Sequence, residues 1–326
     1  MKKIIFFGTP DFATESLRKI LSQDYNVCGV VTSPDKMSGR GMKIHKSPIK
    51  LLAEEHNLNI IQTNNLNDDN FYRELKDLEP DLFVVVAFKK LPEKIWKIPK
   101  YGTFNVHASL LPNYRGAAPI NWVLINGEKE TGLTTFFIDN RIDCGEIIMQ
   151  VKCEINKNES FEDLHKKLMK LSPKITLETI EKIFKGNLKT KKQRLVKNFK
   201  KAPKIYKRDI IINWRKDGYK IYNFIRGFSP FPGARTTMKI INTENQIKYQ
   251  DLIITSVSNF QKKKINTDDI HQLIYDNEEK KIYIQNNNYR FTVDRLKVPG
   301  KKELDGISFA NGFLNKKENQ GSIQFI

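Results

Sequence analysis

The stretch from Asn105 to Pro119 holds the side chains of greatest chemical interest in the sequence. Asn105 and His107 are two positions apart in an apolar run that predicts a strand over 103–107, so both side chains point to one face near the strand's carboxyl end. Ligands bind at that end of open α/β sheets. A structural interpretation competes, because polar groups at strand ends are routinely hydrogen-bonded for stability alone. The loop that follows favours a binding site.

This loop combines apolar side chains with a backbone whose path is restricted. Its first residues are Ser109, Leu110, Leu111 and Pro112, followed by Arg115, Gly116 and Pro119. Prolines and glycines fix the geometry of such a loop, including its backbone donors and acceptors. We expect it to suit a flat heterocycle with amide-like edges.

Asp143 adds a carboxylate thirty-six residues after His107, just beyond a predicted strand. Alone it would be a turn residue. An amide, an imidazole and a carboxylate without an adjacent nucleophile indicate direct acyl transfer to an external amine rather than a covalent acyl-enzyme. We expect Asn105 to donate to the developing oxyanion. His107, made more basic by Asp143, would donate a second hydrogen bond or relay a proton, and Asp143 would accept the proton of the amine.

Cys144, next to Asp143, is a weak nucleophile candidate, because no second histidine lies near it in the sequence. The three cysteines include no CxxC pair, which argues against a disulfide framework or a thiolate metal site. The sequence predicts no metal.

Strands alternate with helices through the first part of the chain. Strands are predicted at 3–7, 26–32, 58–61, 81–87, 103–107, 131–138 and 147–155, and helices at 10–22, 48–57, 68–78, 117–126 and 160–185. This spacing predicts a doubly wound, mostly parallel α/β sheet of Rossmann-like type. The first turn lacks G-x-G-x-x-G, which argues against a dinucleotide site.

Local signals mark two helix starts and one loop. Thr9 is expected to cap the first helix, with Pro10 at its first position. Ser160 and Asp163 form a capping pattern for the helix at 160–185. A loop rich in glycine and lysine is predicted at 33–47.

The length of 326 residues exceeds the usual single core, and two domains are expected. The interpretation assigns 1–188 to the catalytic domain and 189–208 to a basic linker. The remainder, 209–326, has short β-prone pieces (236–241, 250–258, 281–285 and 289–297) that predict a small OB-like β-barrel.

The formal net charge of +19 makes a polyanionic partner plausible. Lysine outnumbers arginine 44 to 12, as biased base composition would also produce, so the location of the charge must decide. Residues 184–208 carry eleven basic residues and no acid. No apolar run has the length needed to cross a bilayer, and the run at 4–7 is cut short by Pro10. We expect a cytoplasmic, monomeric protein that makes no membrane contact.

At these residues the sequence resembles the methionyl-tRNA formyltransferase family, within the wider group of 10-formyltetrahydrofolate-dependent formyltransferases. The Asn105-x-His107 pair, the Ser109-Leu-Leu-Pro112 segment and Asp143 match the group's motif in kind and spacing. Further similarity to the tRNA enzymes covers nearly the whole chain, at 7–13, 33–43, 202–205, 212–214 and 225–234.

The resemblance implies formyl transfer from 10-formyltetrahydrofolate to the amino group of methionine on initiator Met-tRNA. It implies catalytic roles for Asn105, His107 and Asp143, and folate binding by the residues at 109–112. It also implies tRNA contacts from the 33–43 loop, with Arg40 aligned to the family's discriminating arginine. The tRNA-binding residues assigned on this basis are Arg40, Lys36, Lys43, Lys204 and Lys207.

The chain departs from the family pattern in three places: Phe88-Lys89 follows Ala87 where Tyr-Gly is usual, Arg141-Ile-Asp-Cys-Gly-Glu146 replaces Gly-Leu-Asp-Thr-Gly-Asp, and Met42 stands where lysine is common. Two other functions stay open from the residues alone. One is formylation of a small amine such as an amino-sugar nucleotide. The other is RNA binding without catalysis, which the presence of all three catalytic candidates disfavours.

Overall fold

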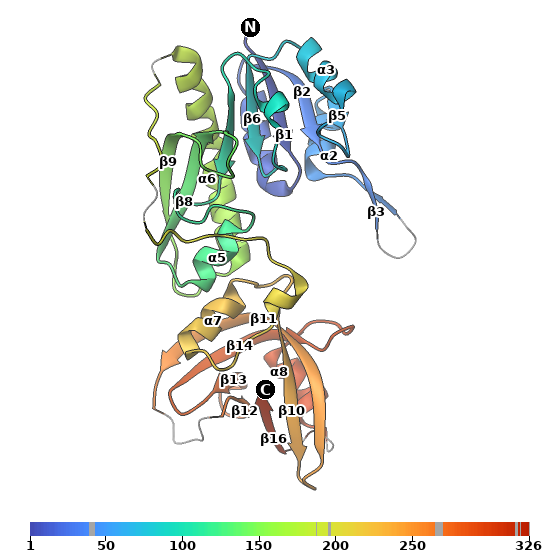
Figure 1. Cartoon of the computed structure of the whole chain (residues 1–326). Helices are drawn as coiled ribbons and strands as arrows, with labels where there is room; N and C mark the ends of the chain where they lie inside the picture. Colours follow the sequence, from blue (N-terminus) through green and yellow to red (C-terminus); the bar gives the residue numbers. More distant parts are fainter. Residues whose placement is uncertain are drawn as a thin grey trace. The chain divides into compact units, whose positions relative to one another are not determined.

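The computed structural model describes residues 1–38, 43–186, 188–194, 197–264, 270–316, 319 and 321–325. By their packing these residues fall into two compact units that interleave along the chain (Figure 1). The first unit consists of Met1–Pro119, Glu130–Glu154 and His165–Lys201, and the second of Ile120–Lys129, Ile155–Leu164 and the chain from Ala202 onward. Because packing and position in the chain divide the molecule differently, the boundaries after residues 188 and 208 stay a prediction.

A seven-stranded sheet in the order β5-β2-β1-β6-β7-β8-β9 forms the centre of the first unit. The parallel strands are β1 (Lys3–Gly8), β2 (Asn26–Thr32), β5 (Ile60–Gln62), β6 (Leu82–Val86) and β7 (Thr103–His107). Antiparallel pairing adds β8 (Glu130–Phe137) and β9 (Ile147–Glu154) at one edge. β1 and β6 are buried almost throughout, as expected of parallel strands covered on both faces. The doubly wound, mostly parallel prediction is confirmed.

Helices connect the parallel strands of this sheet. They are the 3-10 helix η1 (Asp11–Ala13), α1 (Thr14–Leu21), α2 (Pro48–Glu55), α3 (Asp69–Asp77) and the short α4 (Glu93–Trp96). The long α6 (Phe161–Lys185) follows the last strand, β9. The capping pattern before α6 is confirmed, because Ser160 N donates to Asp163 Oδ2 at 3.0 Å and Asp163 N donates to Ser160 Oγ at 3.2 Å. The expected Thr9 cap is wrong. Pro10 occupies the cap position of η1, and the Thr9 hydroxyl instead lies 3.1 Å from that of Ser33.

The predicted loop at 33–47 contains a two-stranded hairpin of β3 (Lys36–Ser38) and β4 (Lys43–His45). Asp35 lies at its base, where Lys50 Nζ donates to Asp35 Oδ2 at 2.7 Å and Gln62 Nε2 to Oδ1 at 3.2 Å. These two hydrogen bonds lower the pKa of the Asp35 carboxyl. Arg40 and Met42 lie outside the described residues.

The second unit is built on a closed antiparallel barrel, which confirms the OB-like prediction. Its strands are β10 (Ala234–Asn242), β11 (Ile247–Lys262), β12 (Gln272–Asp276), β13 (Lys281–Gln285), β14 (Tyr289–Lys297) and β16 (Gly321–Phe325). Pairing of β11 with both β10 and β14 closes the six strands, and β15 (Leu304–Asp305) extends the edge beside β14. The sequence predicted β10, β11, β13 and β14 but missed β12 and β16.

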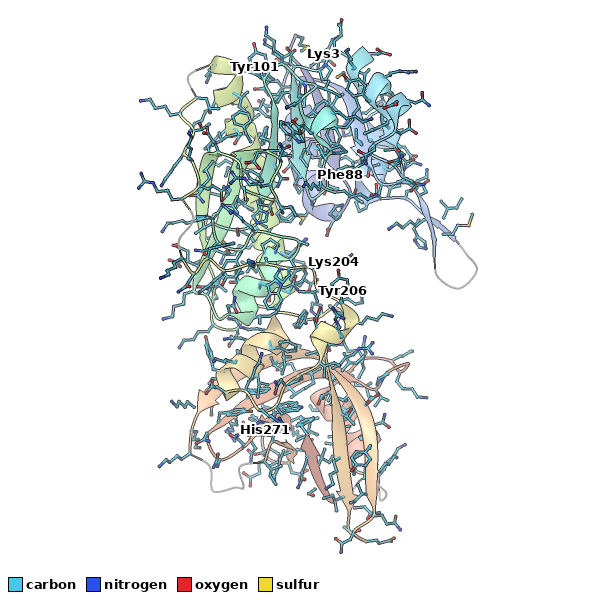
Figure 2. All side chains as sticks on the ribbon, in the orientation of Figure 1. Lys3, Phe88, Tyr101, Lys204, Tyr206 and His271 are labelled. Carbon is cyan, nitrogen blue, oxygen red and sulfur yellow. The ribbon has the colours of Figure 1, made fainter. Side chains whose placement is uncertain are left out.

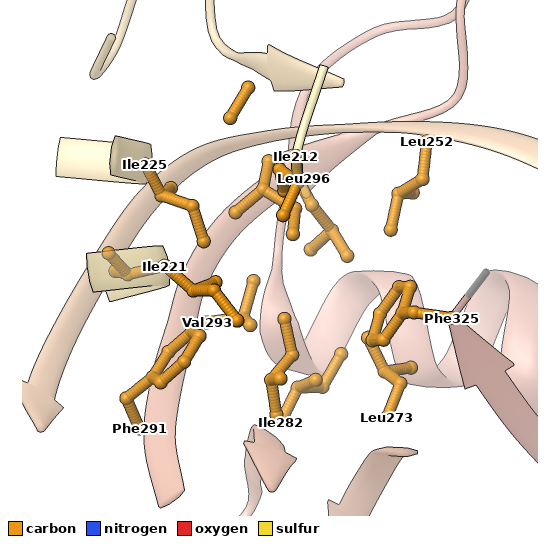
Figure 3. Close-up of a cluster of buried hydrophobic side chains, with 14 of the residues drawn as sticks. Ile212, Ile221, Ile225, Leu252, Leu273, Ile282, Phe291, Val293, Leu296 and Phe325 are labelled. Carbon is orange, nitrogen blue, oxygen red and sulfur yellow. The ribbon is translucent and has the colours of Figure 1, made fainter. Parts of the chain in front are cut away.

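Short helices complete this unit: α5 (Pro119–Ile125), η2 (Lys207–Ile210), α7 (Gly218–Arg226), α8 (Gly306–Phe309) and the π-helix η3 (Ala310–Leu314). Ile221 and Ile225 of α7 point into the barrel core beside Phe291 and Val293 of β14 (Figure 3). The apolar face of α7 therefore fills the barrel next to β11 and β14. No helix of the described part of the chain is long and apolar enough to cross a membrane.

Candidate active site

Strand β7 places Asn105 and His107 in the middle of the first sheet. Asn105 is in register with Val85 of β6 and Phe136 of β8. His107 is the last residue of β7 and lies opposite Thr134. The two side chains therefore emerge on one face at the carboxyl edge of the parallel strands, where such folds bind ligands.

The imidazole of His107 is held by a backbone carbonyl. Its side chain is 6% exposed, and Nε2 lies 2.8 Å from the carbonyl oxygen of Tyr114. Because a carbonyl only accepts, Nε2 carries a proton and donates it. Nδ1 lies 3.8 Å from Asp143 Oδ2, which is within ion-pair range but beyond a hydrogen bond. The ring edge of Phe136 packs on the imidazole at a centroid distance of 6.4 Å.

Asp143 approaches His107 from the turn between β8 and β9. Its Oδ2 accepts a hydrogen bond of 2.8 Å from Gly116 N, in the loop after β7. Its φ of 52° lies in the left-handed region, which an aspartate occupies at some cost. Gly145 lets this turn lie close to β8, since an added Cβ would be 1.6 Å from Phe137 O. The turn thus delivers a carboxylate to both His107 and the 113–116 loop.

Asn105 keeps its amide available for a ligand. The residue is half-buried, and its side chain makes no hydrogen bond with any residue that the structure describes. A half-buried amide without an internal partner is costly unless it meets water or a ligand. The Asn105 side-chain N–H can therefore donate a hydrogen bond to the carbonyl oxygen of a substrate.

The sheet holds the 109–112 segment firmly. Ser109 Oγ donates to Asn113 O at 2.8 Å, Leu111 N donates to Thr134 Oγ1 at 3.1 Å, and Gln150 Nε2 donates to Leu111 O at 2.9 Å. Leu111 packs in a small buried cluster with Phe136 and Ile147. Ser109 and Leu111 are therefore buried with their backbone groups engaged in the protein. Leu110 and Pro112 stay half-buried.

The structure brings the three catalytic candidates and the 109–112 segment together in the first unit. The tRNA candidates lie elsewhere. Lys36 is exposed on β3, and Lys43 starts β4. Lys204 and Lys207 are exposed near the start of the last chain segment of the second unit, where Lys204 Nζ lies 5.4 Å from the ring centroid of Tyr206 (Figure 2).

Two of the departures from the family pattern fall beside the site. Ala87, directly after β6, adopts a left-handed φ of 50°. Lys89, which stands where the family usually has glycine, does not have a positive φ, so a lysine fits there. Phe88 (Figure 2) packs edge-on against Phe7 at a ring-centroid distance of 5.6 Å. Lys89 is exposed. Arg141 is exposed and pairs with Asp139 at 3.2 Å. Its guanidinium is thus directed to the surface.

Sequence reasoning missed two groups that shape this site. One is the Tyr114 carbonyl, which orients His107. The other is the side chain of Gln193, which donates to the backbone of the Asp143 turn. A backbone carbonyl leaves no trace in residue type. For Gln193 the only signal was an uncharged side chain within a run of lysines.

A doubly wound sheet with an amide, an imidazole and a carboxylate at its carboxyl edge, followed by a small barrel, defines a class of acyl-transfer enzymes. The sequence model of the formyl transferase family matches residues 2–180, and that of the formyl transferase C-terminal domain matches residues 204–314. The chain belongs to the formyltransferase family, and it is a formyltransferase enzyme.

Its similarity is to methionyl-tRNA formyltransferases along nearly the whole chain. The protein of that name from Bacteroides thetaiotaomicron is 42% identical over 318 residues, covering 95% of each chain. The one from Flavobacterium johnsoniae is 42% identical and covers 97% of this chain and 98% of its own. The barrel unit is therefore included in the similarity.

Solved structures share the fold. An N-formyltransferase from Helicobacter canadensis, solved with folinic acid and dTDP-3-aminofucose, superposes with a TM-score of 0.63 at 22% identity, covering 90% of this chain and 99% of its own. HypX from Aquifex aeolicus, solved with tetrahydrofolic acid, gives a TM-score of 0.60 at 16% identity, with 96% of this chain and 47% of its own covered. At these identities the likeness concerns the fold.

Proposed function

We propose that this enzyme transfers a formyl group from 10-formyltetrahydrofolate to the amino group of methionine on initiator Met-tRNA. The observation that carries this proposal is the 42% identity to methionyl-tRNA formyltransferases, which extends through both the catalytic sheet and the barrel. The arrangement of Asn105, His107 and Asp143 at the strand ends supports the chemistry. A cytoplasmic location and a monomeric state accompany this proposal.

The folate supplies an activated formyl carbon, and the chain's residues stabilise and neutralise charge around it. Asn105 donates its side-chain N–H to the formyl oxygen as the methionine nitrogen attacks the carbon. This interaction strengthens as negative charge develops on that oxygen. Its availability follows from the absence of a described internal partner.

His107 and Asp143 handle the protons. With Nε2–H committed to Tyr114 O, Nδ1 is the imidazole nitrogen that faces Asp143 and is left to act on the substrate. Asp143 accepts the proton that the amine loses, directly or through one water. That proton then passes by way of His107 Nδ1 to the departing folate nitrogen, so the proton that the amine loses is the one that the folate gains.

Folate binding is assigned to the segment at 109–112. Ser109 and Leu111 set its shape from within the protein, and Leu110 and Pro112 offer partly exposed apolar surface for a flat ring. No metal is needed, because the amide and the histidine carry out the electrostatic stabilisation.

The tRNA contacts are assigned to Lys36 and Lys43 of the hairpin strands, to Arg40, which lies between them in the sequence, and to Lys204 and Lys207. All five are basic residues, which neutralise phosphate charge. Equal activity of the parent enzyme on initiator and elongator Met-tRNA would contradict a discriminating role for Arg40.

One assay tests the function directly. The protein is incubated with labelled 10-formyltetrahydrofolate and charged initiator tRNA, and formyl-methionine is measured after hydrolysis of the ester. Formyl-methionine in amounts that track enzyme concentration supports the proposal. A dTDP-linked amino sugar provides the alternative acceptor, and formylation of that sugar in place of Met-tRNA would replace this proposal with the small-amine function.

A further inference from the structure

The segment after α6 lies across the active-site loops of the first unit. We call described residues 190–194 and 197–201 the strap. Near one end, Lys191 and Ile147 exchange two backbone hydrogen bonds of 2.8 and 2.9 Å. The strap therefore pairs with the start of β9, directly after the turn that carries Asp143.

The other end of the strap holds the loop that orients His107. Lys200 O accepts from Tyr114 N at 2.5 Å, and Lys200 N donates to Asn113 Oδ1 at 3.0 Å. Tyr114 has a φ of 61° and presents its own carbonyl to His107 Nε2. The strap thus fixes a strained residue whose carbonyl sets the histidine tautomer.

Gln193 joins the two loops through its side-chain amide. Nε2 donates to Asp143 O at 3.0 Å and to Gly145 O at 2.8 Å, while Oε1 accepts from Arg115 Nε and Nη2 at 3.1 and 2.6 Å. One side chain therefore connects the Asp143 turn to the residue next to Gly116. The residue is half-buried and uncharged, in a segment rich in lysine.

We propose that Gln193 is a positioning residue that holds the Asp143 carboxylate at Gly116 N and in reach of His107 Nδ1. Asp143 is kept in a left-handed conformation, which costs a non-glycine residue some backbone strain, and hydrogen bonds from outside the turn offset that cost. Gln193 supplies these contacts to the backbone on both sides of Cys144. Arg115 donates to Oε1 from the opposite loop, so a shift of one loop weakens the hydrogen bonds that hold the other.

The kinetic test of this inference rests on the proposed function. A second measurement, hydrogen exchange at Gly116 N–H, needs no substrate. Gln193→Met keeps the length of the side chain and removes its hydrogen bonds. We expect kcat for formyl transfer to fall about 10- to 100-fold, as a small misplacement of a catalytic group produces, with KM for tRNA and folate within about twofold. Hydrogen exchange at Gly116 N–H should accelerate about tenfold, since its acceptor is less firmly placed.

The matched control is Gln23→Met, which alters an exposed glutamine of the same unit. It should change neither kcat nor the exchange rate. Arg115→Lys keeps the charge but loses the paired hydrogen bonds to Oε1. It should lower kcat and accelerate exchange at Gly116 N–H, each by a smaller factor than Gln193→Met. If Gln193→Met melts far below the parent, Arg115→Lys is judged by both readouts in its place.

The role of Gln193 is wrong if kcat stays within twofold of the parent, or if Gly116 exchange is unchanged while kcat falls. A parent enzyme that fails to formylate Met-tRNA would contradict the proposed function instead. The exchange rate at Gly116 would still decide whether Gln193 holds the Asp143 turn.

Discussion

At the scale of single residues, the side-chain amide of Asn105 differs from the other polar groups of the site in having no described internal partner. We predict that Asn105→Ala lowers kcat about 10²- to 10³-fold with little change in KM, because loss of one oxyanion donor costs about 3–4 kcal/mol in the transition state. Stability should change little, since no described hydrogen bond is broken. Steady-state kinetics and thermal melting measure the two effects.

Asn59→Ala is the matched control, because Asn59 is exposed and precedes a strand remote from the 105–119 stretch. It should leave kcat unchanged. An Asn105→Ala enzyme with near-parental kcat would mean that the oxyanion is stabilised by another group.

His107 offers a second residue-scale test, because its two nitrogens have separate partners. We predict that His107→Gln folds with nearly parental stability, since the glutamine amide nitrogen can replace Nε2 in donating to Tyr114 O. His107→Asn, whose shorter amide occupies the Nδ1 position, should leave that carbonyl without its donor and melt lower. Both variants should lose most formyl transfer, because neither amide titrates.

Comparison of the two melting temperatures provides the measurement. If His107→Asn were the more stable variant, the Tyr114 carbonyl would not be the group that orients the ring.

At the scale of elements, the turn from β8 to β9 depends on close backbone packing. We predict that Gly145→Ala moves the turn and misplaces Asp143, because the new Cβ would overlap Phe137 O. kcat should fall at least tenfold, and tRNA affinity should be retained. Gly312→Ala is the control, since a Cβ added there would meet no described residue within 4 Å. A fully active Gly145→Ala enzyme would show that the turn tolerates displacement.

The sequence predicts those elements that a local pattern of residues specifies, and it does not predict those that depend on contacts between distant residues. β1, β6 and β7 are apolar runs that a buried strand requires, and their positions follow from periodicity. The pair Asn105 and His107 follows from strand alternation. Asp143 was grouped with this pair from its residue type and its place after a predicted strand, but its distance from His107 could not be predicted, because the thirty-five residues between them form no local pattern.

Other features depend on tertiary contacts that no local pattern records. β12 and β16 are short and only partly buried, so they lack a strong period-2 signal. The Thr9 hydroxyl meets Ser33 from a neighbouring strand end instead of capping η1. The strap was predicted as a linker from its lysines, although its backbone pairs with β9.

At the scale of the whole molecule, the net charge indicates a basic surface but does not locate a binding site on it. The +19 charge comes mainly from lysines, many of them exposed and spread over both units. Such a distribution attracts any polyanion through long-range fields. Substitution of a lysine that contacts a phosphate should therefore change the salt dependence of tRNA binding more than substitution of another exposed lysine does.

We predict that the double substitution Lys204→Ala with Lys207→Ala weakens binding of initiator tRNA. It should reduce the slope of log K against log salt concentration by about one unit for each phosphate that the protein no longer neutralises. kcat at saturating tRNA should be unchanged, because neither residue is one of the three catalytic candidates. Lys170→Ala with Lys174→Ala removes the same charge from exposed positions of α6 and serves as control. Equal slopes for the two double variants would mean that Lys204 and Lys207 contribute only to the general field, and a larger reduction for the 204/207 pair would assign them direct phosphate contacts.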